Sequence, residues 1–327
     1  MKKITVIGGG TGTFVVLSGL KKNKHLNLGV IVTMMDSGGS TGRLRDQLGV
    51  LPPGDLRQCL LALSEAPLLW RKLFLYRFEN GDLNGHNFGN IFLSALEKVS
   101  SNYKDVVDTA GYVLKIKGQV IPVTFANTHM CVEYENGKIV KKEGNIDTNY
   151  QEKSRVKRAF LEPKVEANCA AIKRIAESDY LIIGPGDFYS SIIPVLLVNG
   201  IKEAIMKSPA KIIYILNLMT RSGQTTDYKA TDHLKDIETN IARKVDYVIV
   251  NNGKISKSII DWYQKEDERV VINDLKSNGF RGQIIEGDII DNNAIRSEGS
   301  EKYIDPKVRS ILRHDSGKLS KLLKNII

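Results

Sequence analysis

Two glycine-rich segments contain the residues of this sequence that are best suited to binding and chemistry. The first, Gly8–Thr13, follows the apolar run Lys3–Ile7 and precedes apolar residues at helical spacing over Phe14–Leu20. Glycine lets a backbone approach a phosphate, and the N-terminus of the next helix favours an anion. This segment therefore predicts a phosphate-binding loop, with a tight turn without ligand as the alternative. The residues expected to contact the ligand are Gly9, Gly10, Thr11, Gly12 and Thr13.

The second segment, Asp36–Arg43, follows the apolar run Leu26–Met35. It offers a carboxylate, three hydroxyl groups, three glycines and a guanidinium group. These groups suit a second phosphate, or a phosphate-bound Mg²⁺ held by Asp36. Asp36 is thus a candidate catalytic and metal-binding residue, with a loop or helix cap as the alternative. The other residues expected to contact the ligand are Ser37, Gly38, Gly39, Ser40, Thr41 and Arg43.

Polar loops also follow the later apolar runs of the chain. Gly85–Asn90 precedes a helical pattern, Gly184–Ser191 repeats the strand, glycine and helix arrangement, and Asn217–Thr226 is polar. His86 is a candidate acid or base, with a structural loop histidine as the alternative. Ligands of open α/β sheets bind outside the carboxyl ends of the strands, so these loops predict one shared site. The further ligand-contact candidates are Asn87, Gly184, Gly186, Asn217, Thr220 and Asn251, with Tyr263 for base stacking and Arg313 for phosphate pairing.

The elements that position these loops alternate between strand and helix patterns. The expected strands are Lys3–Ile7, Leu26–Met35, Tyr180–Ile183, Lys211–Leu216 and Val245–Val250. Such alternation predicts a Rossmann-like, doubly wound α/β fold, with a mostly parallel sheet and helices on both faces. The helix after Pro52-Pro53-Gly54 is expected to be capped by Asp55.

We expect residues 1–327 to form a single Rossmann-like domain with two additions. Strand patterns at Val120–Phe125 and Met130–Tyr134, with a turn at Asn136-Gly137, predict a small antiparallel β insertion from about residue 118 to 144. A basic polar linker follows it, and Lys153–Arg158 is expected to be a solvated face. The stretch from about 264 to 327 is expected to be a less regular extension that ends in an amphipathic helix near Leu319–Ile326.

Composition argues against several classes of protein. The net charge of +10 is dispersed and lacks neighbouring aromatic platforms, so nucleic-acid binding is not expected. The apolar run Ile192–Val198 is too short to span a bilayer, and the N-terminus does not resemble a signal peptide, so we expect a cytoplasmic protein. The three cysteines have neither zinc nor redox spacing.

Seven segments occur together in the order of one known bacterial family. They are Val6–Gly12, Met35–Arg45, Leu51–Leu61, Gly85–Leu93, Leu181–Pro194, Asn217–Thr225 and Val248–Gly253, with a further match at Arg313–Asp315. Over residues 4 to about 263 the sequence thereby resembles the gluconeogenesis factor family, which is related to 2-phospho-L-lactate transferase.

The resemblance implies a Rossmann-like fold and a nucleotide-sugar ligand such as UDP-N-acetylglucosamine. It also implies a role in cell shape and in the supply of cell-wall precursors during gluconeogenic growth. Protein partners of cell-wall regulation and a homo-oligomer would fit this role. In the transferase relatives, the loop that matches Asp36 holds a metal and a diphosphate.

Four hypotheses for function follow. The first is a regulator that binds a UDP-sugar or a related diphosphonucleotide. The second is a transferase of a phospho-group or phosphosugar that uses Asp36 with Mg²⁺, and His86 as acid or base. The third is an NAD-dependent oxidoreductase, which only the first glycine-rich segment suggests. The fourth, an RNA-binding protein, rests on net charge alone.

Overall fold

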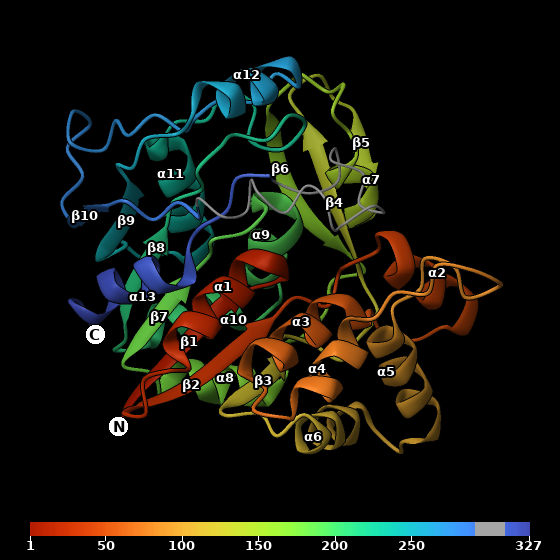
Figure 1. Cartoon of the computed structure of the whole chain (residues 1–327). Coiled ribbons are helices and arrows are strands. Elements are labelled where there is room, and N and C mark those ends of the chain that lie inside the picture. The colour runs from red at the N-terminus through yellow and green to blue at the C-terminus, as the bar shows by residue number, and fades with distance from the viewer. Residues whose placement is uncertain (292–310) are drawn as a thin grey trace.

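Seven parallel strands form the central sheet, in the order β10-β9-β8-β7-β1-β2-β3 (Figure 1). The structure is a computed structural model that describes residues 1–291 and 311–327. The predicted doubly wound α/β fold is confirmed. The strands are β1 (Lys2–Gly8), β2 (Leu26–Val32), β3 (Gln119–Pro122), β7 (Tyr180–Ile183), β8 (Lys211–Ile215), β9 (Tyr247–Asn251) and β10 (Gln283–Gly287).

Two inner strands of this sheet, β1 and β2, are apolar along most of their length. They pair in parallel, with Ile4 opposite Leu28 and Val6 opposite Val30. These four side chains point to one face of the sheet and are buried, and so are Ile7 and Ile31 on the other face. Burial on both faces is typical of a parallel strand covered by helices on each side, and it explains the near-continuous apolar runs in the sequence.

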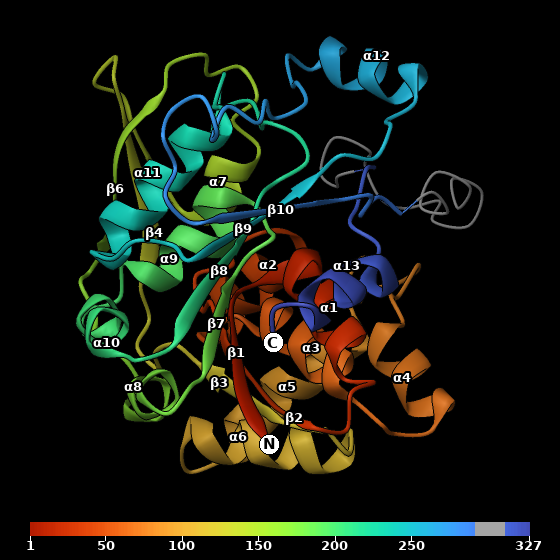
Figure 2. The same cartoon turned by 90° about the vertical axis from the view of Figure 1, so that its left-hand side faces the viewer.

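Helices cover both faces of the sheet, as expected (Figure 2). One face carries α1 (Gly10–Leu20), α3 (Pro53–Leu63) and α13 (Ser316–Lys324), and the other α8 (Cys169–Ala176), α9 (Ile193–Leu196), α10 (Ile201–Lys207) and α11 (Ala230–Ile241). Helix α5 packs on α3, and α2, α4 and α6 pack on α5. The bounds of the remaining helices are α2 (Gly39–Leu48), α4 (Leu68–Leu75), α5 (Phe88–Val99), α6 (Tyr103–Val113), α12 (Lys257–Lys265) and the π-helix η1 (Phe188–Ile192).

A small antiparallel sheet lies beside the main sheet, with the order β5-β4-β6. It contains β4 (His129–Tyr134), β5 (Ile139–Lys141) and β6 (Val156–Glu162), with α7 (Glu143–Asp147) between β5 and β6. The limits differ from the expected 118–144. The first predicted strand is β3, which pairs in parallel with β2 because Val120 and Ile121 join the main core. The expected basic linker runs into strand β6, whose exposed Lys157 and Arg158 pair with Glu133 of β4.

The C-terminal extension is more regular than expected. Strand β10 pairs in parallel with β9 and completes one edge of the main sheet. Helix α13 lies against α1, where a Cβ atom on Gly19 would lie 2.3 Å from the Ser316 carbonyl oxygen. Residues 292–310 of the extension lie outside the described part of the chain.

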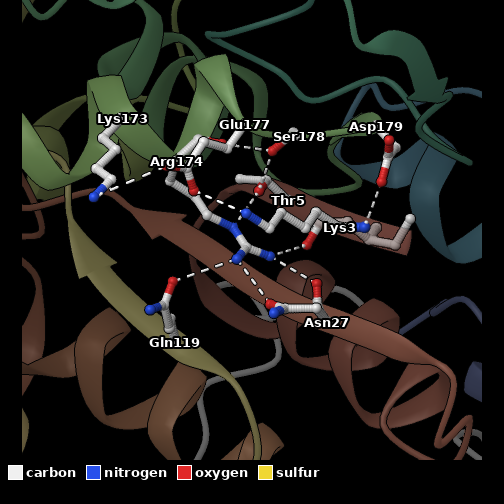
Figure 3. Close-up of polar contacts among 10 residues, drawn as sticks. Lys3, Thr5, Asn27, Gln119, Lys173, Arg174, Glu177, Ser178 and Asp179 are labelled. Carbon is white, nitrogen blue, oxygen red and sulfur yellow. Dashed lines mark hydrogen bonds and ion pairs between the residues drawn. The ribbon is translucent and has the colours of Figure 1, made fainter. Parts of the chain in front are cut away.

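One buried arginine joins α8 to three strands (Figure 3). The Arg174 Nε donates to Thr5 Oγ1 at 2.8 Å, and Nη2 donates to the carbonyl oxygens of Ile4 and Asn27 at 3.1 and 2.7 Å. Its Nη1 donates to the side-chain oxygens of Asn27 and Gln119 at 2.8 and 3.4 Å. The guanidinium group therefore ties β1, β2 and β3 to the helix layer.

We predict that Arg174→Leu lowers the free energy of unfolding by about 3–5 kcal/mol, because buried acceptors would lose their donor. Gly29 makes room for this group, since a Cβ atom there would lie 2.5 Å from Arg174 Nε. Urea denaturation checks the value. Lys173→Leu is the matched control, because the Lys173 side chain is 77% exposed on the same helix. Equal losses in the two variants would contradict the prediction.

Candidate ligand-binding site

The loops after β1 and β7 meet where the strand order of the sheet reverses. Strands β1 and β7 are neighbours, although β2 and β3 continue in one direction and β8 to β10 in the other. Gly12 lies so close to the loop after β7 that a Cβ atom on Gly12 would be 2.1 Å from the Pro185 carbonyl oxygen. The sequence predicts that Gly12 makes room for a phosphate, and in the structure its lack of a side chain also allows the two backbones to touch.

A cavity of about 610 Å³ opens at this place, over the carboxyl ends of the strands. Its walls include many of the predicted ligand-contact residues: Gly9, Gly10, Thr11, Gly12, Asp36, Gly38, Gly39, Ser40, Thr41, Gly186, Asn217, Thr220, Tyr263 and Arg313. A larger hollow of about 970 Å³ lies elsewhere, and Trp70, Tyr112 and Arg174 are among its lining residues. The smaller cavity is the candidate site because the glycine-rich loops converge there.

The loop after β1 is held by the carboxylate of Asp55, a residue predicted to be a helix cap. Gly10 has a positive φ of 63°, and its N–H donates to Asp55 Oδ1 at 2.9 Å. We expected Asp55 to cap its own helix, and this prediction is wrong. Helix α3 begins at Pro53, and Pro52 is its N-cap residue. At the third position of α3, the Asp55 side chain reaches across to α1. Asp55 is thus a site residue that sequence reasoning missed.

Three carboxylates from different segments share this part of the cavity. Loss of hydration raises the pKa of Asp55 well above its usual value, and the neighbouring Asp36 raises it further. Desolvation and the charges of Asp36 and Asp147 likewise raise the pKa of Glu143. Desolvation also raises the pKa of Asp36, despite hydrogen bonds from Gly38 and Thr41. A proton, a hydroxyl group or a cation would relieve this repulsion.

A half-buried ion pair connects α7 to the loop after β8. Arg221 Nη2 lies 2.9 Å from Asp147 Oδ1, and Arg221 Nε lies 3.9 Å from Asp187 Oδ1. Desolvation raises the pKa of Asp147 to about 6, although Arg221 acts in the opposite direction. Desolvation also raises the pKa of the buried Glu268 to about 7. The sequence gives no sign that these residues, or Glu143, meet at the site, because they lie in separate segments without a motif.

The glycine-rich segment Asp36–Arg43 contacts His86 through Ser40. Ser40 Oγ lies 3.1 Å from His86 Nδ1. Desolvation, followed by the charges of Arg43 and Arg77, lowers the pKa of His86 below its usual value, which favours the neutral imidazole. Ser40 lines the cavity and His86 is not among the described lining residues. His86 therefore reaches the cavity only through the Ser40 hydroxyl.

Several predicted ligand contacts have structural partners instead. Asn87 caps α5, where its Oδ1 accepts from Gly89 N and its Nδ2 donates to the Leu75 carbonyl oxygen, both at 2.9 Å. Asn251 likewise accepts from Gly253 N at 3.1 Å. The predicted residues that are not among the described lining residues of the cavity are Thr13, Ser37, Arg43, His86, Asn87, Gly184 and Asn251.

The opposite wall combines apolar side chains with free acceptors. Leu218, Met219, Tyr263 and Leu312 form a small buried cluster that also lines the cavity. Tyr263 accepts a hydrogen bond at its hydroxyl from Leu312 N at 3.0 Å. His314 is 8% exposed, its Nε2 is without a hydrogen-bond partner, and burial lowers its pKa to about 4. This wall suits a flat, partly apolar ring that carries hydrogen-bond donors.

Membrane-spanning helices and clusters of metal-ligating side chains are both absent from the described residues. None of the helices in this part of the chain combines the length and the apolar character that a bilayer-spanning segment needs. Residues 1–291 and 311–327 contain no group of three or more histidine, cysteine, aspartate or glutamate side chains that could hold a metal ion. Mg²⁺ often uses only one or two carboxylates together with substrate phosphates, a pattern that Asp36 and Asp55 fit.

The fold and the cavity define a doubly wound α/β protein with a candidate ligand site at its topological switch point, where such folds bind nucleotides. The family model 2-phospho-L-lactate transferase CofD matches residues 4–295. The gluconeogenesis factor of Bacillus subtilis is 37% identical over 99% of this chain and 98% of its own length. The chain belongs to the gluconeogenesis factor family, within the larger CofD-like group, as the sequence motifs predicted.

Two further relatives agree with this assignment. The gluconeogenesis factor of Listeria innocua is 41% identical over 79% of this chain and 80% of its own length. A crystal structure of a UPF0052 family protein from Bacillus halodurans superposes with a TM-score of 0.87 at 36% identity, and 98% of each chain is covered.

We predict that Gly12→Ala lowers the free energy of unfolding by about 2–3 kcal/mol, because the added methyl group would push the Pro185 backbone away. Gly38→Ala is the control, since a Cβ atom there would be no closer than 3.7 Å to Asp36 Oδ1. Chemical denaturation of both variants checks this. A stable Gly12→Ala protein would show that the loops need not touch.

We also predict a pH-dependent gain in stability for Glu143→Gln. The pKa of Glu143 is raised in the folded protein, so wild-type stability falls as pH rises above the ordinary glutamate pKa of 4.5. Glutamine removes this ionisation, so the gain should be small at about pH 5 and larger at about pH 8. Denaturation at both pH values measures it, with the exposed Glu135→Gln as control. An equal gain at both pH values would contradict the assignment.

Proposed function

We propose that this protein binds a nucleotide sugar, with UDP-N-acetylglucosamine as the representative ligand, and acts as a regulator. One observation carries the proposal. The loops after β1 and β7 meet at the switch point, and the cavity there has two ends that differ in chemistry. A diphosphate between a base and a sugar matches that sequence of environments. In this proposal the protein acts in the cytoplasm, on cell shape and cell-wall precursor supply during gluconeogenic growth.

The three parts of the ligand have separate places in this proposal. The diphosphate lies at the N-terminus of α1, near Gly10 and Thr11, because the positive end of the helix dipole favours an anion. The base lies against the apolar wall that includes Tyr263, with Arg313 near the phosphates. The sugar lies at the other end, near Ser40 and Thr41, whose hydroxyl groups can exchange hydrogen bonds with sugar hydroxyls.

The raised pKa values of two carboxyl groups in the cavity reduce their repulsion of a bound diphosphate. Asp36 and Asp55 have raised pKa values, so each can take a proton or accept a hydrogen bond from a ligand hydroxyl. This account requires no metal. It supports a binding protein in which Asp36 contacts ribose or sugar.

The second candidate is an Mg²⁺-dependent transferase of a phospho-group or phosphosugar. The observation that favours it is the presence of a second carboxylate, Asp55, in the cavity beside Asp36. These two residues would hold the ion, which would stabilise negative charge on the phosphates. The neutral His86 would accept a proton through Ser40 at the Nδ1 atom.

We predict that UDP-N-acetylglucosamine raises the melting temperature of the protein, while UMP and uridine raise it weakly. At a concentration one hundred times the Kd, the ligand should stabilise the fold by about 2.7 kcal/mol. Differential scanning fluorimetry measures this. Stabilisation only by compounds without phosphate would refute the proposal.

Asp36→Asn separates the two candidate functions. In the binding protein, affinity should not depend on Mg²⁺, and the variant should lose about 1.5–3 kcal/mol of binding free energy from one charged hydrogen bond. In the transferase, wild-type binding should strengthen with Mg²⁺, and the variant should lose this dependence together with any turnover. Calorimetry with and without Mg²⁺, followed by product analysis, distinguishes them. We expect the first result.

A further inference from the structure

His314 lies in the cavity wall against which the proposed binding mode places the base. Its residue position pairs with Ile290 in an isolated antiparallel bridge. Two residues earlier in the chain, Leu312 N donates to the Tyr263 hydroxyl oxygen at 3.0 Å. The backbone around His314 is therefore fixed on the same wall as the aromatic ring of Tyr263, which also lines the cavity.

The hydrogen bonds of the His314 ring determine which of its nitrogens carries the proton. The ring donates a hydrogen bond to the carbonyl oxygen of Leu216, the residue that follows β8. Among residues 1–291 and 311–327, Nε2 of His314 has no hydrogen-bond partner, so the donor is Nδ1. Burial lowers the pKa of His314 to about 4, so the ring is neutral at pH 7 and Nε2 is an acceptor.

A second buried acceptor lies on the residue after Leu216. Asn217 Nδ2 donates to the Gly186 carbonyl oxygen at 2.8 Å, and this bond sets the orientation of the amide. Asn217 Oδ1 is buried and has no hydrogen-bond partner in the described part of the chain, and Asn217 lines the cavity as His314 does. Because buried acceptors are normally satisfied, these two atoms indicate that a ligand with hydrogen-bond donors completes this wall.

We propose that His314 selects the base of the nucleotide by accepting a hydrogen bond from a ring N–H group. Uracil carries this hydrogen at N3 and guanine at N1, whereas cytosine N3 and adenine N1 have a lone pair instead. A lone pair placed against Nε2 would leave two buried acceptors in contact, which disfavours those bases. This inference rests on the proposed function, because the nucleotide sugar places its base on this wall. It adds the class of base that is accepted and the residue that rejects the others.

Four nucleotide sugars that share glucose test the proposal, because they differ only in the base. Calorimetry on the full chain should show that UDP-glucose binds at least about tenfold more tightly than CDP-glucose, the effect of one hydrogen bond that is made or left unmade. If purines fit the wall, GDP-glucose should exceed ADP-glucose by a similar ratio, which distinguishes the two sources of the ring N–H group. Methylation of N3 in UDP removes this group and should lower the affinity to about that of CDP.

Two variants separate base selection from a structural role of His314. In His314→Gln the amide can turn its NH2 group toward the base, so CDP-glucose should gain affinity and the preference for UDP-glucose should fall to about twofold or less. His314→Phe keeps a ring and removes the acceptor, so UDP-glucose should lose about tenfold while CDP-glucose changes little. His129→Phe is the matched control and should keep the preference. His129 Nδ1 is also buried without a partner among the described residues, but His129 is not among the described lining residues of the cavity.

The outcomes distinguish failure of base selection from failure of the proposed function. Equal affinities within both pairs of ligands in the wild type would overturn base selection and leave nucleotide-sugar binding intact. An unchanged preference in His314→Gln, or an equal loss for every ligand in both variants, would overturn the role of His314. If none of the four ligands binds, the proposed function fails and base selection fails with it.

NMR of the ¹⁵N-labelled histidine rings gives a readout that does not depend on affinity. In the free protein Nδ1 of His314 should carry the proton, and UDP-glucose should shift the Nε2 resonance more than CDP-glucose does at equal saturation. A proton on Nε2 in the free protein, or equal shifts with both ligands, would contradict the proposal.

Discussion

The contact between two backbones at Gly12 and Pro185 is the constraint on which the site depends. A side chain at Gly12 would overlap the Pro185 carbonyl group, so the loops after β1 and β7 can touch only with glycine there. Their contact fixes the N-terminus of α1 against the second half of the sheet. The cavity opens beside that contact, and both Gly12 and Pro185 line it, together with Gly10, whose N–H donates to Asp55.

The site holds unbalanced charge of both signs, at separate places. Desolvation and the charge of Asp36 raise the pKa values of Asp55 and Glu143 in the middle of the cavity, whereas desolvation and the charge of Arg43 lower the pKa of Arg77 at one end. A protein selected only for stability would pair these groups, since unpaired charges in a partly dehydrated cleft cost free energy. Their separation is typical of a site in which a ligand provides the missing partners.

The fold was predictable from the sequence to a greater extent than the site. The buried runs of β1 and β2 and the glycines that follow them are local patterns, and the structure places both where we expected them. Asp55 and Arg77 could not be assigned in this way, because their partners, Gly10 and Gly85, are fixed by tertiary contacts. Residue type alone also did not reveal that Asn87 caps α5, because an amide before a helix can equally bind a ligand.

The small antiparallel sheet contributes to the site through α7. Glu143 Oε2 accepts from Ser37 N at 3.1 Å, and Ser37 Oγ accepts from Gly144 N at 2.8 Å, so α7 and the second glycine-rich loop hold each other. Arg221 joins the other end of α7, at Asp147, to the loop after β8. A ligand in the cavity would therefore contact a wall that depends on both sheets. Changes in the packing of the small sheet would move Glu143 and alter the charge next to Asp36, although no strand of that sheet belongs to the main sheet.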